Sequence, residues 1–168
     1  AVQMSALPHN AIARFLKCDR GAMLVEFCMA LPVLLLFFAV SVEGGRIAWT
    51  YQSAAAGVRD AARMVARMAP DDLCTSGSGV AGYDALATQI VTNSLSGTST
   101  IPNGATVVDV APTLRCVPGS FRLNPTPIVE IRAEVQIDYL RGNIFGLFGN
   151  SLGPLNMELA DQSRVFGN

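Results

Sequence analysis

The chain has 168 residues, of which 12 are basic and 13 acidic, and its formal net charge is −1. A balance this close to zero argues against the positive surface that nucleic-acid binding requires, so no nucleic-acid partner is expected. Hydrophobic residues make up 51% of the sequence. Much of that excess lies in one apolar run, and the remainder has the composition of one ordinary domain.

The apolar run extends from Ala22 to Val42 and contains a single charged residue, Glu26. About 20 apolar residues at about 1.5 Å per residue cross the hydrocarbon core of a bilayer, so the run predicts a transmembrane helix. A carboxylate inside such a helix is costly and marks a functional site. Pro32 has no N–H to donate to the carbonyl of Cys28, which predicts a local kink.

Residues 1–21 place Arg14, Lys17 and Arg20 before the apolar run. This is the layout of a targeting leader or a cytoplasmic flank. The N-terminal position of the span favours a single-pass protein with its N-terminus inside and its C-terminal part outside the cytoplasm. The run is longer than the hydrophobic region of a secretory signal, although small residues before position 42 leave cleavage after Ser41 as an alternative.

Residues 43–69 predict an amphipathic helix that continues the transmembrane helix, since apolar residues recur there every three or four positions. Gly44 and Gly45 allow a bend where the chain leaves the membrane. The arginines on the opposite side of this helix either face solvent or contact partner subunits. The side expected to be buried consists of Ile47, Tyr51, Ala54, Val58, Ala62 (or Ala61), Val65 and Met68.

Residues 70–168 predict an extracytoplasmic domain of the α+β class, with a small helix and an antiparallel sheet. The Gly- and Ser-rich stretch 70–83 predicts a loop. Residues 84–95 predict a short helix that Asp84 caps. The side of this helix expected to face a core holds Leu86, Ile90, Val91 and Leu95.

The sheet is expected to have strands at 105–111 and 128–140 and a third at 155–165, with a connection over 115–127. Apolar and polar residues alternate through 128–140, which indicates one buried and one wet face. The expected buried positions are Val129, Ile131, Ala133, Val135, Ile137 and Tyr139. The apolar residues of the following glycine-rich loop either fold over the sheet or face a partner: Ile144, Phe145, Leu147 and Phe148.

The four cysteines are Cys18, Cys28, Cys74 and Cys116. Cys18 precedes the apolar run and Cys28 lies within it, so neither easily reaches the later pair. If the residues after Val42 are outside the cytoplasm, Cys74 and Cys116 are the natural disulfide. Two free buried thiols are the alternative.

The sequence offers little material for catalysis. Its one histidine, His9, lies before the apolar run, and there is no metal-ligand cluster, Gly-rich phosphate loop or G-x-S-x-G motif. Asp71 and Asp72 are adjacent carboxylates, which solvation in a loop explains. We therefore expect no enzymatic activity, no catalytic residue, no metal and no cofactor.

The segment RGAMLVEFCMALPVLLLFFAVSVEGGR, followed by an alanine-rich helix with RDAAR, resembles the TadE/TadF-like minor pseudopilins of tight-adherence (Flp-type) pilus systems. The resemblance covers Asp19 to Met68. The matching elements are Arg20-Gly21, Glu26-Phe27, Leu31-Pro32, Glu43, Arg46 and the Ala/Arg pattern through Arg63.

The resemblance implies a pilin-like fold and a prepilin peptidase that cuts between Gly21 and Ala22, which makes residues 1–21 a leader peptide. Glu26, next to Phe27, is then the fifth residue of the mature chain. The new ammonium group on Ala22 of a neighbouring subunit would pair with Glu26 and set the register of assembly.

The implied partners are the prepilin peptidase, other pilins and pseudopilins, the Tad assembly platform and inner-membrane lipid. The implied location is the inner membrane, and then the periplasm or the pilus at the cell surface. A TadE-like and a TadF-like role both stay open. The alternative is a single-pass membrane-anchored binding or adhesion protein that is not cleaved at Gly21.

Overall fold

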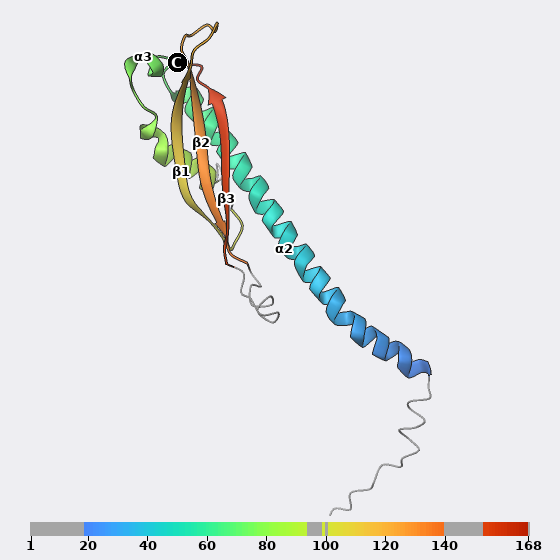
Figure 1. Ribbon diagram of the computed structural model, residues 1–168. Coiled ribbons are helices and arrows are strands. Elements are labelled where there is room, and N and C mark those ends of the chain that lie inside the picture. Colours follow the sequence, from blue (N-terminus) through green and yellow to red (C-terminus); the bar gives the residue numbers. More distant parts are fainter. Residues whose placement is uncertain (1–18, 94–98, 100, 140–152, 168) are drawn as a thin grey trace, which may run out of the picture. The chain divides into compact units, whose positions relative to one another are not determined.

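The computed structural model describes residues 19–93, 99, 101–139 and 153–167, and the chain divides into two compact units, residues 1–42 and 43–168 (Figure 1). Helices and a three-stranded antiparallel sheet confirm the predicted α+β class. The elements in chain order are α2 (Asp19–Met68), α3 (Leu73–Ser76), the 3₁₀ helix η1 (Ala81–Tyr83), α4 (Asp84–Thr92), β1 (Ala105–Val117), β2 (Thr126–Ile137) and β3 (Leu155–Arg164).

Helix α2 is continuous over 50 residues and includes Pro32. It also continues through Gly44 and Gly45, so the bend that these glycines allow does not interrupt the helix. Neither glycine has a positive φ. Tertiary contacts around this turn, described below, hold the backbone in the helical conformation and offset the low helix propensity of glycine.

The sheet has the strand order β1-β2-β3, with both pairs antiparallel. The β1–β2 register runs from Ala105 opposite Ile137 to Val117 opposite Thr126, with a bulge between Val107 and Asp109. In the β2–β3 pair, Ile137 lies opposite Leu155.

Three strand boundaries differ from the prediction. β1 continues to Val117, through residues expected to form a connection, and β2 begins at Thr126 and ends at Ile137 instead of spanning 128–140. Pro112 lies inside β1, a strand at the edge of the sheet, where a proline is tolerated because only one side of the strand is hydrogen-bonded within the sheet. The third strand, β3, lies where it was expected.

One hydrophobic core joins the sheet to the second half of α2. The predicted alternation in β2 is confirmed, since its five inward residues are at most 1% exposed: Val129, Ile131, Ala133, Val135 and Ile137. Tyr139, the sixth, lies beyond the strand and is half-buried. The helix contributes mostly alanine and valine to this core: Ala54, Val58, Ala61, Ala62, Val65, Ala66 and Ala69.

Two residues predicted for the buried side of α2 are exposed: Tyr51 is 52% exposed and Met68 is 45% exposed. Thr50 takes the buried position beside Tyr51, and Ala69 takes the one beside Met68. Thr50 satisfies its hydroxyl by donating to the carbonyl of Arg46 at 3.0 Å, within the same helix. A polar residue therefore occupies a core position that a search for apolar periodicity assigned to its neighbour.

The segment after α2 holds two short helices, α3 and η1, where a loop was expected. Asp84 begins α4 but does not cap it, because Tyr83 occupies the cap position and makes no capping bond with its side chain. Ala87 and Val91 are the buried residues of α4. Leu86 and Ile90 are half-buried, while Leu95 and the apolar loop residues 144–148 lie outside the described residues.

Helix α4 crosses α2 closely at Gly57. A Cβ atom at this position would lie 3.0 Å from both the Cα and the carbonyl oxygen of Val91. The absence of a side chain at Gly57 is therefore what allows the two backbones to approach. A disulfide joins Cys74 in α3 to Cys116 in β1, with a Cα–Cα distance of 5.8 Å, and so attaches the segment after α2 to the sheet.

Candidate functional site

The first half of α2 carries its apolar side chains without cover from the described chain. From Met23 to Val42 every residue is exposed apart from the half-buried Ala39. By length and composition, α2 is the one described helix able to cross a membrane. A helix that is apolar on all sides is stable only when something outside it excludes water, such as lipid or other subunits.

Glu26 and Phe27 are both exposed on this helix, and Phe27 is 58% exposed. Within the part of the chain that the structure describes, Glu26 forms no ion pair. Gly21 and Ala22 lie in the same helix, and the helical rise places Glu26 about 6 Å beyond Ala22. The carboxylate is therefore available to a group from outside the chain.

The structure also places Pro32 and three of the four cysteines. Pro32 lies inside α2, which does not end there. Cys28 is a free, exposed cysteine. Cys74 and Cys116, the pair that the sequence analysis expected to be bonded, are joined in the second unit.

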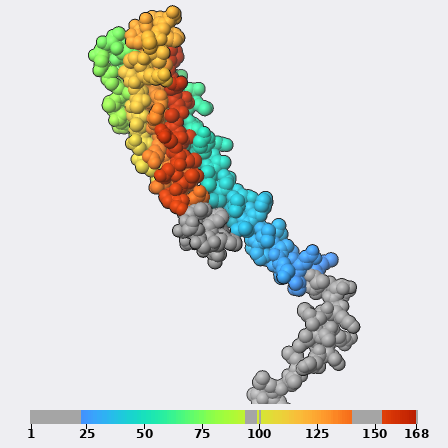
Figure 2. Space-filling view, viewed as in Figure 1, coloured from blue at the N-terminus to red at the C-terminus, as the bar shows by residue number. Residues whose placement is uncertain are grey.

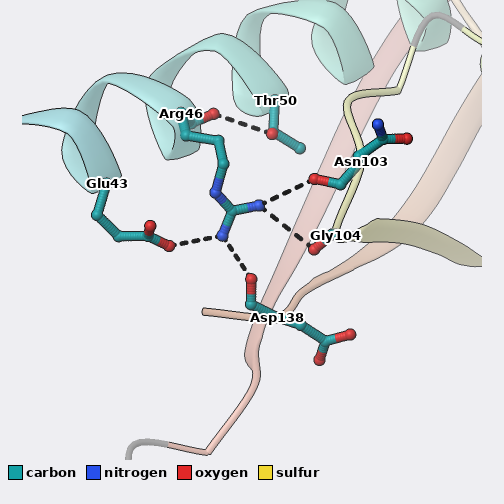
Figure 3. Close-up of polar contacts among 6 residues, drawn as sticks. All are labelled: Glu43, Arg46, Thr50, Asn103, Gly104 and Asp138. Atoms are coloured by element: carbon teal, nitrogen blue, oxygen red, sulfur yellow. Dashed lines mark hydrogen bonds and ion pairs between the residues drawn. The ribbon is translucent and has the colours of Figure 1, made fainter. Parts of the chain in front are cut away.

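In the second unit, a cluster of polar contacts is centred on Arg46 (Figure 3). Its Nη2 atom donates to Oε1 of Glu43 at 2.6 Å, and both side chains are only 10% exposed. Nη1 donates to the backbone carbonyls of Asn103 and Gly104 at 3.3 and 3.4 Å. Nη2 also donates to the carbonyl of Asp138. We call Glu43, Arg46 and these three carbonyls the exit clamp.

The exit clamp ties α2 to the start of β1 and to the end of β2. Asn103 and Gly104 precede β1, Asp138 follows β2, and the amide of Asp138 donates to the carbonyl of Gly104 at 2.8 Å. Gly104 has a φ of 82°, in the left-handed region that glycine adopts without strain. A charged donor shared among carbonyls holds more strongly than a neutral one, so Arg46 fixes the domain to the helix at this level.

The exit clamp was not predicted from the sequence. Glu43 and Arg46 were recognised there only as elements of the family resemblance and as the end of the apolar run. Their spacing of three residues with opposite charges is a signal for a helical ion pair. The carbonyl acceptors carry no such signal, because any residue supplies one and these lie more than fifty positions away in the sequence.

The arginines of α2 do not decide between solvent and partner subunits, the two alternatives that the sequence left open. Arg59 binds Asp161 of β3 at 3.3 Å, and its side chain is 58% exposed. Exposed pairs of this kind contribute about 0–1 kcal/mol. Arg63 and Arg67 are exposed, which is compatible with either solvent or a partner.

The outer face of the sheet is polar and is turned toward the viewer in Figure 2, with β3 in red. Asp109, Glu134 and Glu158 lie opposite one another across the three strands. With Arg132 they line an open hollow of about 490 Å³. The hydrogen bond to Glu130 and its negative charge raise the pKa of Arg132 above its ordinary value. Among the described residues, no group of His, Cys, Asp and Glu has the arrangement of a metal site.

One comparison with known proteins bears on helix α2. Residues 21–63 match the family model of TadE-like proteins. This match agrees with the resemblance to TadE/TadF-like proteins over the segment that includes Glu26, Glu43 and Arg46. The comparison with curated proteins found no match, and neither did the comparison with solved structures.

Proposed function

Because this chain carries a TadE-like segment at residues 21–63, we propose that it is a minor pseudopilin, a structural and assembly component of a Tad (type IVc, Flp-type) pilus. The TadE-like family consists of pilus structural components, not of enzymes. The observation that carries the proposal is that the matched segment coincides with an uncovered apolar helix whose one carboxylate is exposed.

The proposed pathway begins with insertion in the inner membrane, with the N-terminus in the cytoplasm. Arg14, Lys17 and Arg20 support this orientation because positive charges are retained on the cytoplasmic side. A prepilin peptidase then cleaves between Gly21 and Ala22 and releases the leader. The disulfide between Cys74 and Cys116 agrees with a domain that lies in the periplasm, where disulfides persist.

Assembly would use the group that cleavage creates. A free ammonium on Ala22 of one subunit has a counterpart in the exposed Glu26 of its neighbour, if the helices are staggered by about one helical turn. In an apolar setting each charge is far more costly alone than paired, so the pair selects one stagger over others. Phe27 and the other exposed apolar side chains would then be covered by neighbouring helices.

The exit clamp would link the stagger between neighbouring helices to the position of the domain. Arg46 bonds to the backbone on both sides of the β1–β2 pair, so the domain has little freedom to slide along the helix residues that it contacts. A stagger set between helices would therefore also set the spacing between domains on the fibre.

The test is the N-terminus of the protein extracted from membranes, measured by mass spectrometry with and without a prepilin peptidase. A peptidase-dependent start at Ala22 is expected, and Gly21→Leu should leave residues 1–21 attached. A start at Val42 would instead indicate a secreted protein. A leader that is retained in both strains would favour the membrane-anchored binding or adhesion protein.

A further inference from the structure

The exposed surface of α2 stays free of charge well beyond the apolar run. Between Glu26 and Arg59 the only charged residues are Glu43 and Arg46. Those two bind each other and are 10% exposed, and Arg46 also donates to the backbone carbonyls of the exit clamp (Figure 3). The side of the helix that faces away from the domain therefore presents no charged group until Arg59.

Two aromatic residues lie on this charge-free surface, just after the exit clamp. Trp49 is 66% exposed and Tyr51 is 52% exposed. They are two positions apart, which places them roughly 200° apart around the helix, so they point to different sides of it. Each joins an apolar ring to one polar hydrogen-bonding group, the combination that is enriched where a bilayer meets water.

The position of Trp49 along the helix fits the thickness of a bilayer. From Met23 to Trp49 the helical rise amounts to about 39 Å. A bilayer with its headgroup layers measures about 40–45 Å, and its hydrocarbon core about 30 Å. With the average tilt of about 20°, the stretch from Met23 to Trp49 covers about 37 Å along the membrane normal, which is the hydrocarbon core plus one headgroup layer. If Met23 lies at the cytoplasmic edge of the core, the core therefore ends near Gly44 and Trp49 lies in the outer part of the headgroup layer.

We propose that Trp49 and Tyr51 lie in the headgroup layer of the membrane before assembly, and that the exit clamp lies at the same level. The lipid surface is the partner of this part of α2, and water begins beyond Tyr51, not at Val42. The inference rests on the membrane insertion in the proposed function. It also explains why Glu43 and Arg46 are closed off by protein, since a free charge at that depth would be costly.

The experiment uses the fact that Trp49 is the only tryptophan in the chain. The full chain is reconstituted at a low protein-to-lipid ratio in phosphatidylethanolamine/phosphatidylglycerol vesicles, whose acyl chains are brominated either near the headgroup or near the chain end. We expect blue-shifted emission, stronger loss of fluorescence with bromine near the headgroup, and weak quenching by aqueous acrylamide. The matched control is Trp49→Phe combined with Phe121→Trp, because Phe121 is 51% exposed and follows β1 at the other end of that strand.

The control tryptophan should lose fluorescence to acrylamide and not to brominated lipid. If Trp49 behaves in the same way as the control, the proposal is overturned. The charge-free side of α2 would then be a contact surface for a neighbouring subunit. A second measurement separates this result from a failure of insertion. In a Cys18→Ser variant, Cys28 should resist a membrane-impermeant maleimide. A protected Cys28 with an unquenched Trp49 rejects only the proposed depth, whereas a labelled Cys28 rejects membrane insertion and the inference with it.

Discussion

The two halves of α2 belong to one helix but differ in what packs against them. The first half is rich in leucine and phenylalanine and is uncovered on all sides, and the second half is rich in alanine and is buried along one stripe. Small residues allow the sheet and α4 to approach the helix, as Gly57 does beside Val91. Large residues on all sides instead suit lipid or other helices. The chain thus provides the partner of the second half and leaves the first half to its surroundings.

The sharpest way to test this difference is to change the one charged residue of the uncovered half. Glu26→Gln should permit insertion and cleavage while sharply reducing incorporation into pili, because the neutral amide cannot compensate the ammonium on Ala22. The measurement is the amount of sheared pilus that contains the protein, normalised to the amount of processed protein in the membrane.

Ser41→Ala serves as the matched control on the same half. Among the described residues, the Ser41 hydroxyl bonds to the carbonyl of Phe37 in its own helix, at 2.9 Å, and to no other group, so its loss should leave incorporation unchanged. Undiminished pilus formation by Glu26→Gln would remove the proposed register role of Glu26.

Loss of the disulfide should destabilise only the domain that packs on the second half of α2. Its two cysteines are separated by 42 positions, and closing a loop of that length restricts the unfolded chain by about 4 kcal/mol. Cys74→Ser with Cys116→Ser should lower the free energy of unfolding of the domain by about that amount, measured by urea denaturation in detergent micelles. Cys28→Ser, on the uncovered half, should leave that free energy unchanged.

The exit clamp is where the two halves meet, and Arg46→Met tests whether it holds the domain. We expect a loss of about 3 kcal/mol in the free energy of unfolding, because Glu43 would keep a nearly buried carboxylate without its partner. Adding Glu43→Gln should recover part of the loss, which a purely steric effect of methionine would not allow. Arg67→Met, at an exposed position, should change stability by less than about 0.5 kcal/mol.

What the sequence predicted well depends on local pattern. Alternation in 128–140 identified the buried face of β2 because each residue reports its own side of the strand. Glu26 was noticed from the sequence because a lone charge in an apolar run needs no structural context, and its role stays a prediction. The family match over 21–63 covers the same local segment.

What the sequence did not predict depends on contacts between distant segments. β1 extends to Val117 because it pairs with β2, although Cys116 lies in the stretch 115–127 that was expected to be a connection. Thr50 is buried because its hydroxyl has a partner one turn away, which hides it from apolar periodicity. The exit clamp needs backbone carbonyls that only the folded sheet brings to Arg46.

The mildest test uses one substitution at two places on the same helix. Val65 is fully buried in the core and Val33 is 67% exposed on the apolar half. Val65→Ala should lower the free energy of unfolding by about 2 kcal/mol, since it removes two buried methyl groups and leaves a small cavity. Val33→Ala should leave the urea midpoint in micelles unchanged, because no described part of the domain covers that side chain. Equal losses at the two positions would mean that the domain also supports the first half, and the division between the halves would not hold.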